Sequence, residues 1–415
     1  DLIFGDDQSS FEPSLDVRYR ITPSLSATLT LNTDFSTAEI DDQQVALDRF
    51  SLFFPEKRDF FLQDAGIFEF GNIRTNGRPF FSRRIGLSDD GQAVGIDGGI
   101  KLTGRIGDFN VGALAIHQEE SGAVSAKDLF VARGSYNVLD ESTIGFIMTH
   151  GDPTSNESNS VVGLHFLYRN SDGPFGEILT GRFWAQQSDS SNLDGDDRAF
   201  GVNVEIPSDK LSAYVDLQQI DEDFRPALGF VNRAGIRQYE TGMRYRTRPE
   251  TGFWRAINHR FDYTLVTDMG DQTLSQRLAI EPIGLYSNRD DYMFLRWARQ
   301  EETVRDGFDL FDRLNIPAGD YEFDRYRAEL RTGQQRPVRV IFAVEDGGFF
   351  GGDRLEKHVE VQWRQSAYLA LGVGFTENVV DLPSGSFTSH LASLRSDIAF
   401  NSRWSWSNLV QYDNT

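Results

Sequence analysis

Cysteine is absent from the 415 residues of this chain. Its absence excludes a disulfide scaffold, a thiolate metal site and a thiol nucleophile. Long hydrophobic runs are absent too, so the sequence offers no candidate for a membrane-spanning helix. Neither a Pro/Ser-rich linker nor a low-complexity tract divides the chain. These absences favour one large domain whose fold depends neither on disulfides nor on transmembrane helices.

Basic residues are scarce relative to acidic ones, since 41 Lys and Arg face 63 Asp and Glu and give a formal net charge of -22. A protein that binds phosphate backbones needs a basic surface, so the balance argues against a nucleic-acid partner. Much of the acid lies in predicted loops, where solvated loop tips are the ordinary interpretation. The acidic clusters are Asp89-Asp90, Asp194 with Asp196-Asp197, Asp221 to Asp223, and Asp290-Asp291.

A divalent cation that bridges anionic lipid headgroups is the alternative interpretation of these loops. Asn192 to Asp197 places oxygen ligands at suitable spacing, but it lacks the full twelve-residue loop with a distal bidentate Glu. Calcium at the acidic loops is therefore a weak candidate, and we predict no other metal and no cofactor.

A strict alternation of apolar and polar residues is the dominant pattern of the chain. From Leu15 to Ile21 every second residue is apolar, and Asp16, Arg18 and Arg20 occupy the positions between. Because side chains alternate across a strand, such a segment has one apolar face and one polar face. A face with two arginines and an aspartate does not fit a sandwich core, so the pattern predicts a closed barrel with lipid outside and water inside.

Segments of this kind recur about twenty times along the chain. Leu211 to Leu217 is a clear example, which predicts that Val215 faces lipid and Asp216 faces the lumen. Tight connections such as Gly107-Asp108 alternate with long ones such as Arg305 to Glu322, as the two rims of outer-membrane barrels require. Tryptophans near strand ends are predicted to form interfacial girdles. They are Trp184, Trp254, Trp297, Trp363, Trp404 and Trp406.

One region, residues 36–78, breaks the alternation. Dense phenylalanine interleaved with charge does not fit a lipid-facing strand, and a long ordered segment of a barrel protein usually folds into the lumen. We therefore predict an internal plug or constriction whose charges meet the charged barrel wall, with a self-packed external loop as the alternative. Deleting Asp41 to Phe70 is expected to leave a barrel that inserts and conducts more. The predicted plug residues are Phe53, Phe54, Glu56, Lys57, Arg58, Asp59, Phe60 and Phe61.

Arginines are prominent on the polar register of the predicted strands, with Glu329 and Glu345 among them. In an open lumen, opposed rows of Arg and carboxylate discriminate between permeants. The alternative is that these residues pair with one another or with the plug and fill the barrel. The predicted lumen-lining and selectivity residues are Arg18, Arg20, Arg182, Arg244, Arg246, Arg325, Arg327 and Arg331.

Catalytic patterns are weak. The six histidines are scattered without metal-ligand spacing, and we find no nucleophile elbow, Walker loop or dinucleotide fingerprint. No catalytic residue is predicted. An outer-membrane hydrolase remains an alternative, because some barrels carry a Ser-His site on the outer wall.

Several motifs resemble a family of Gram-negative outer-membrane barrels classed as a domain of unknown function. They are Leu31 to Ser36, Phe54 to Leu62, Phe81 to Gly86, Pro226 to Arg233 and Leu382 to Thr388. The resemblance extends over nearly the whole chain. It implies that the barrel usually follows a family-9 carbohydrate-binding-like module, which this sequence lacks, and it implies no settled activity. Asp1 opens without a visible signal peptide, so we expect a processed or trimmed chain that lacks residues at both ends.

The sequence thus predicts a single all-β domain over residues 1–415. It is a transmembrane, antiparallel outer-membrane β-barrel of about 20 strands, within a range of roughly 18 to 24. The leading function is porin-like passage or docking of an envelope substrate, which the resemblance suggests is saccharide-related. A plugged scaffold barrel that holds a partner protein complex is the second hypothesis. Expected partners are outer-membrane lipid and lipopolysaccharide, with other envelope proteins or saccharides as further candidates, in the Gram-negative outer membrane.

Overall fold

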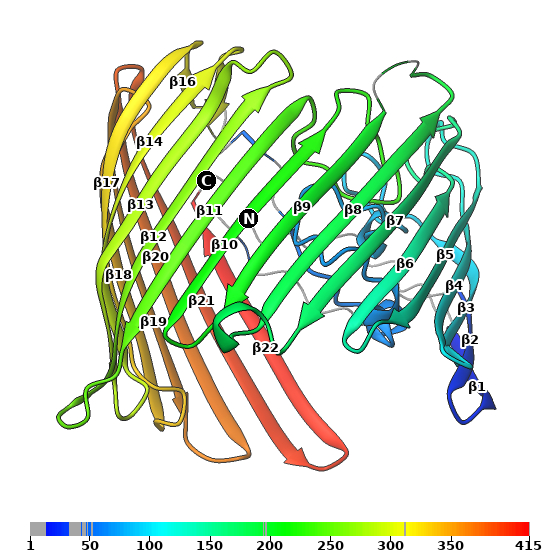
Figure 1. Ribbon diagram of the computed structural model, residues 1–415, viewed down its shortest axis with the longest axis horizontal. Helices are drawn as coiled ribbons and strands as arrows, with labels where there is room; N and C mark the ends of the chain where they lie inside the picture. Colours follow the sequence, from blue (N-terminus) through cyan, green and yellow to red (C-terminus); the bar gives the residue numbers. More distant parts are fainter. Residues whose placement is uncertain are drawn as a thin grey trace.

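A computed structural model describes residues 14–32, 43, 47, 49–50, 53–193, 195, 197–310 and 313–414. Twenty strands in these ranges form one antiparallel sheet, which confirms the predicted fold class and strand number. The sheet curves into an outer-membrane type of barrel with strongly tilted strands and a plug-like segment inside it (Figure 1). No helix in the described ranges is long and apolar enough to cross a membrane.

The first eleven strands are β1 (Leu15–Thr22), β2 (Leu25–Leu31), β3 (Ile96–Ile106), β4 (Phe109–Gln118), β5 (Lys127–Val138), β6 (Ser142–His150), β7 (Asn159–Asn170), β8 (Leu179–Ser190), β9 (Arg198–Pro207), β10 (Leu211–Ile220) and β11 (Ile236–Thr247). The remaining wall strands are β12 (Trp254–Asp268), β13 (Thr273–Ser287), β14 (Tyr292–Val304), β17 (Gly319–Arg331), β18 (Val338–Phe349), β19 (Gly352–Arg364), β20 (Leu369–Leu382), β21 (Gly385–Asn401) and β22 (Trp404–Asp413). A separate hairpin joins β15 (Phe308–Leu310) to β16 (Leu314–Ile316). The helices are α1 (Asp59–Leu62), η1 (Ala65–Phe68), η2 (Ser82–Arg84) and η3 (Pro174–Gly176).

Each wall strand pairs with the next one along the chain, so the sheet is an up-and-down meander from β1 to β22. Within the described residues no pairing joins β1 to β22, and these two strands are the edges of the sheet. Because the number of strands is even, the start of β1 and the end of β22 lie at the same rim.

The two rims differ in the length of their connections. The rim that carries the start of β1 also carries residues 32–95, 221–235 and 305–318, and we call it the long-loop rim. The opposite, short-turn rim carries residues 23–24, 107–108, 208–210 and 402–403. The predicted asymmetry is therefore present. Its exceptions are residues 171–178 at the short-turn rim and the two-residue turns 350–351 and 383–384 at the long-loop rim.

The outer face changes character along the strands β14 and β17. Met293 opposite Leu330 is followed, toward the long-loop rim, by the aromatic pair Trp297 and Tyr326. Beyond that pair the outer face is charged, and Arg299 forms an ion pair with Glu322. This order of apolar, aromatic and charged residues is typical of the boundary between lipid and headgroups.

A second aromatic band lies near the short-turn rim. Its exposed members on the later strands and turns are Trp363, Tyr368, Phe400, Trp404 and Trp406. Along β21 the outward positions from Phe400 to His390 span about 25 Å of height at a strand tilt of roughly 40°. That height matches the apolar band of a transmembrane barrel.

The girdle prediction is wrong for Trp184. This side chain is only 6% exposed and belongs to the internal apolar cluster. A Cβ on Gly71 would lie 3.2 Å from the Trp184 Cβ atom, which shows how closely the plug backbone approaches it. Trp184 lies in the middle of β8, two residues after Arg182 on the same inward face, so the alternation itself places it in the lumen and not in a girdle.

Val215 provides a test of the lipid-facing register. Its side chain is exposed on the outer face, while its neighbour Asp216 forms an ion pair with Arg182 inside the barrel. We expect Val215→Arg to destabilise the inserted barrel by about 2 to 4 kcal/mol, because the substitution places a guanidinium in the apolar band. Val215→Leu, the matched control, should change stability by less than about 0.5 kcal/mol. Urea unfolding in lipid vesicles measures both values, and equal stabilities of the two variants would contradict the register.

Candidate functional site

The barrel interior is divided into two unlike halves. Against β3 to β9 the inner wall carries apolar side chains among buried polar ones such as Lys101 and Gln186, and it is covered by the segment of residues 53–95, which we call the plug. Phe60, Phe61, Phe68 and Phe70 of the plug are buried together with wall residues such as Ile116. In Figure 1 the plug lies within the barrel outline, behind β7 to β9. Against the later strands the inner wall is polar and charged.

The plug continues beyond the predicted end at residue 78. Ile85 and Val94 are as deeply buried as the phenylalanines, so the whole stretch up to β3 contributes to the packing. Part of the predicted beginning, residues 36–42, lies outside the described residues. The predicted residues Phe53, Phe54 and Glu56 to Phe61 all belong to the plug, and Asp59 begins α1.

Lys101 anchors the plug to the wall. Its side chain projects inward from β3 and is 1% exposed. The Lys101 ammonium donates hydrogen bonds to the carbonyl oxygens of Phe60 and Gln63, the latter at 2.6 Å, and it lies 4.7 Å from the centre of the Phe60 ring. Thr103, two residues further along β3, donates to Asp64 at 2.8 Å. Because α1 is a single turn, the carbonyl oxygens at its end have no partner within the helix, and Lys101 supplies their hydrogen bonds.

The charged stretch of the plug is braced internally, contrary to the prediction that its charges meet the charged wall. Glu56 and Arg58 form an ion pair at 2.7 Å, and Ser82 donates a hydrogen bond to Glu56 at 2.6 Å. Arg58 also donates to the Ile85 carbonyl at 2.6 Å. Burial opposes ionisation of Glu56, but the Arg58 and Ser82 contacts outweigh it and hold the pKa of this carboxyl below its usual value. These contacts connect residues 56–58 of the plug to residues 82–85.

Two of the motifs that carried the resemblance meet at one aromatic cluster, together with Phe53, which directly precedes a third. The ring of Phe53 lies 4.7 Å from that of Phe81 and 5.2 Å from that of Phe230, centre to centre. The backbones of Arg78 and Phe230 form a β-bridge, and a Cβ on Gly229 would lie 2.0 Å from the Arg78 carbonyl oxygen. Only glycine permits this approach, so the 221–235 connection is fitted to the plug surface.

Long polar side chains of the wall donate to carbonyl oxygens of the plug. Arg182 donates to Asn72 at 2.7 Å, Gln186 to Gly77 at 2.8 Å and Gln218 to Asn76 at 2.8 Å. Among the predicted lumen arginines, Arg182 and Arg18 are therefore plug contacts, since Arg18 lies 3.4 Å from Asp64. Arg20 is exposed on the same face of β1 as Arg18.

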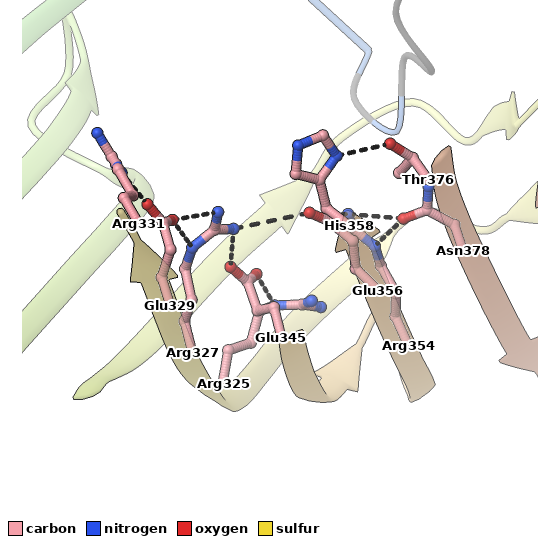
Figure 2. Close-up of polar contacts among 10 residues, drawn as sticks. All are labelled: Arg325, Arg327, Glu329, Arg331, Glu345, Arg354, Glu356, His358, Thr376 and Asn378. Atoms are coloured by element: carbon pink, nitrogen blue, oxygen red, sulfur yellow. Dashed lines mark hydrogen bonds and ion pairs between the residues drawn. The ribbon is translucent and has the colours of Figure 1, made fainter. Parts of the chain in front are cut away.

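The open half of the lumen carries a ladder of alternating arginines and carboxylates, which we call the charge ladder (Figure 2). Arg327 is at its centre, with ion pairs to Glu329 at 2.8 Å, Glu345 at 3.2 Å and Glu356 at 3.6 Å. Arg325 pairs with Glu345 at 2.6 Å. The ladder is completed by the ion pairs Arg331 with Glu329 and Arg354 with Glu356, and by the hydrogen bond from Arg354 to Asn378 at 2.9 Å.

The ladder favours the interpretation in which the predicted arginines pair with carboxylates of the barrel wall. Arg325 is 5% exposed and Glu329 is 6% exposed, so both charges are largely removed from water. Arg246 forms an ion pair with Asp209 at 2.7 Å, and Arg244 donates to the Ser208 carbonyl at 3.3 Å, so both bind the turn at the short-turn rim. A selectivity role for these arginines stays a prediction.

A cavity of about 780 Å³ adjoins the charge ladder on β18 to β22. Its lining is rich in charged and amide side chains, and Gln43 from the β2–β3 connection lies across it, where its backbone amide donates to Gln411 at 2.7 Å. Five arginines and three carboxylates line it. They are Arg336, Arg339, Arg354, Arg364, Arg395, Glu356, Glu360 and Asp397.

Metal-binding geometry is not found in the part of the chain that the structure describes, where no three His, Asp or Glu side chains cluster suitably. The predicted calcium loop falls partly outside that part, because Asp194 and Asp196 are not described. The six histidines occupy separate positions, and His358 contacts Thr376 at 2.9 Å in the open half of the lumen.

A buried ion pair joins two loops at the long-loop rim. Asp152 is fully buried and pairs with Arg225 at 2.8 Å. Burial opposes its ionisation, but hydrogen bonds from Ser155 and Thr154, together with Arg225, lower the pKa of Asp152 below its usual value. A carboxyl with a depressed pKa stabilises the fold above its unfolded pKa of about 4, and that contribution is lost as the pH falls through the lower folded pKa.

We therefore expect the 221–235 connection to stay docked from about pH 8 to 5 and to loosen below about pH 4. Hydrogen exchange of its backbone amides, corrected for the intrinsic effect of pH, measures the change. Asp152→Asn should raise exchange at neutral pH and reduce the acid dependence. An unchanged acid dependence in this variant would assign the effect to other groups.

Comparison with known proteins gives limited matches. A family model described as a domain of unknown function (DUF5916) matches residues 4–98, which include the first three motifs of the resemblance. The resemblance is thus supported over this part of the chain, and the later motifs and the carbohydrate-binding-like module stay predictions. No curated protein matches the chain.

Solved structures with a related outline are outer-membrane proteins. OpdQ from Pseudomonas aeruginosa is 10% identical, with a TM-score of 0.42 over 77% of this chain and 90% of that one. The outer membrane protein opdK from the same organism is 11% identical, with a TM-score of 0.43 over 79% and 96%. The ferric yersiniabactin uptake receptor FyuA from Yersinia pestis is 10% identical, with a TM-score of 0.34 over 96% and 69%. Scores at this level add nothing to the fold that the strand pairings already define.

Proposed function

We propose that the protein is a Gram-negative outer-membrane barrel through which a small hydrophilic solute passes along the open half of the lumen. The observation that carries the proposal is the cavity of about 780 Å³ beside the charge ladder. A lumen packed with side chains throughout would favour a closed scaffold. A polar cavity on the inner wall favours passage, because a hydrated solute keeps hydrogen-bond partners along its route.

The outer face supports placement in a membrane. Its apolar band ends at aromatic residues on both sides, at Trp297 and Tyr326 toward the long loops and at Trp363 and Trp404 toward the short turns. Side chains of these types prefer the interface between hydrocarbon and headgroups. Lipid and lipopolysaccharide are accordingly the partners that we propose for this surface.

In this proposal the plug acts as a constriction. It fills the half of the lumen under β3 to β9 and leaves the half under β18 to β22 for passage. Gln43 lies on the boundary between the two halves, because it follows β2 in the chain and donates to Asp413 of β22 at 2.7 Å. The route of a solute is thus set by the plug on one side and by the charge ladder on the other.

Single-channel recording in planar bilayers tests the proposal. The wild-type protein should give steady, ohmic currents. Ser393 lines the cavity, so Ser393→Trp should lower the conductance at least about twofold. The adjacent Leu394 is exposed on the outer face, and Leu394→Trp should leave the conductance unchanged.

A silent wild-type protein that is folded and inserted would support the plugged scaffold instead. That second candidate is favoured by one specific observation, the extensive apolar packing between the plug and the inner wall. A hydrolase is not proposed, because the arginines and carboxylates of the charge ladder are paired with one another. The saccharide-related cargo implied by the resemblance stays a prediction.

A further inference from the structure

The cavity contains one row of residues that is set apart from the charge ladder. Arg339 on β18, Gln362 on β19, Gly372 on β20 and Arg395 on β21 are direct partners in the sheet register. Their side chains lie on the inner face. Arg364 follows two residues after Gln362 on the same face, so two guanidinium groups flank the Gln362 amide.

Small residues make room above this row. Gly372 is flanked on its own face by Ala370 and Gly374, and all three line the cavity. A Cβ on Gly372 would meet no atom closer than 3.7 Å. The space between the arginines is therefore open to a ligand, whereas the charge ladder is closed by its own ion pairs.

Arg339 and Arg364 differ from the arginines of the charge ladder in their partners. The Arg339 guanidinium donates only to the Gln362 amide oxygen, at 3.4 Å, and its Nε is buried without a hydrogen-bond partner. Over the described residues, no carboxylate lies within ion-pair distance of Arg339 or Arg364. Arg325, Arg327 and Arg354 are all neutralised by glutamates. Arg339 and Arg364 are thus positive charges without an ion pair, in a cavity whose lining also includes Glu360 and Asp397.

We propose that the cavity over Gly372 binds a small oxyanion, of the carboxylate or phosphate class, between Arg339 and Arg364. A guanidinium presents two parallel N–H groups that match the paired oxygens of either ligand. Gln362 lies beside them, where its amide oxygen accepts from Arg339 and its amide nitrogen donates to Glu360. The inference rests on the proposed function, because it names the class of solute that the lumen would pass.

Equilibrium dialysis of the full chain, folded in detergent, against radiolabelled inorganic phosphate or succinate tests the site. This measurement of binding does not depend on conductance. We expect saturable binding of at least one probe. Arg339→Gln and Arg364→Gln should each weaken it about tenfold, which corresponds to the loss of one charge-assisted hydrogen bond. Gly372→Leu, which fills the space, should weaken it as much. Arg403→Gln, in the turn between β21 and β22, is the control and should leave binding unchanged.

The two probes distinguish the ligand classes, since tighter binding of phosphate or of succinate identifies the group that the site prefers. Binding that is absent, or that is unaltered in all three cavity variants, overturns the inference. A wild-type protein that conducts but binds neither probe would leave the proposed passage in place and remove only the anion site. A protein that binds a probe through Arg339 and Arg364 but never conducts would support the site and refute the passage.

Discussion

Replacing residues 33–95 by a short Gly-Ser linker should prevent the barrel from folding. The linker is sterically feasible because β2 and β3 are already paired neighbours. The loss would expose wall side chains that the plug now covers, each with a burial worth roughly 1.5 to 3 kcal/mol. Five such residues amount to roughly 8 to 15 kcal/mol, as much as the whole stability of a typical domain. They are Leu114, Ile116, Leu129, Val131 and Ile147.

The heat-modifiable shift of folded barrels in gel electrophoresis measures this outcome. A rescue variant provides the control: the same deletion with Leu114, Ile116, Leu129, Val131 and Ile147 changed to Ser or Thr should fold again, because its inner wall tolerates water. Under the proposed function the rescued barrel should also conduct more than the wild type. Normal folding of the simple deletion would show that the plug is dispensable, as the sequence alone predicted for removal of Asp41 to Phe70.

Arg327→Met should destabilise the open half of the barrel by about 3 to 5 kcal/mol. Arg327 contacts three glutamates, and its removal leaves their charges facing one another with only Arg325, Arg331 and Arg354 at the edges of the group. Arg327→Lys should have an intermediate effect, since a single ammonium does not span three carboxylates. Urea unfolding in vesicles measures both variants.

A double-mutant cycle isolates the ladder from other effects. Adding Glu345→Gln to Arg327→Met removes one of the carboxylates left without a partner, and we expect it to recover about 1 to 3 kcal/mol. Additive losses in the double variant would mean that the ladder is screened by water and contributes little. The selectivity role of Arg325 and Arg327 stays a prediction, and a Glu at either position would lie beside Glu345.

The fold was predictable because one pattern, alternation, specifies both the strand and its lipid-facing side. Val215 and Asp216 lie as the alternation predicted, and the number of strands followed from counting the segments. Long range contacts were not predictable in this way. Trp184 lies on the same inward register of β8 as Arg182, so the alternation gives its direction, whereas its burial depends on plug residues more than a hundred positions earlier.

The candidate site was only partly predictable for the same reason. The arginines of β17 were found because they occupy the polar register, but their partners lie on β17 itself and on two other strands, β18 and β19 (Figure 2). Lys101 was missed, although it offered a signal. It is a cation in the middle of β3, on the inner register between Gly99 and Thr103, and a cation buried there needs an acceptor. The anchoring role depends on Phe60 and Gln63 carbonyls, which the sequence does not place.

The position of the plug between β2 and β3 sets the order in which the wall can assemble. All other neighbouring wall strands are joined by connections no longer than residues 221–235, whereas β2 and β3 pair across residues 32–95. Closing that loop costs roughly 2 to 3 kcal/mol more chain entropy than closing a four-residue turn. Collapse of the plug onto β4 to β8 shortens the effective loop before the strands meet. We therefore expect the β1–β2 hairpin to pair with β3 after the plug has packed on the wall.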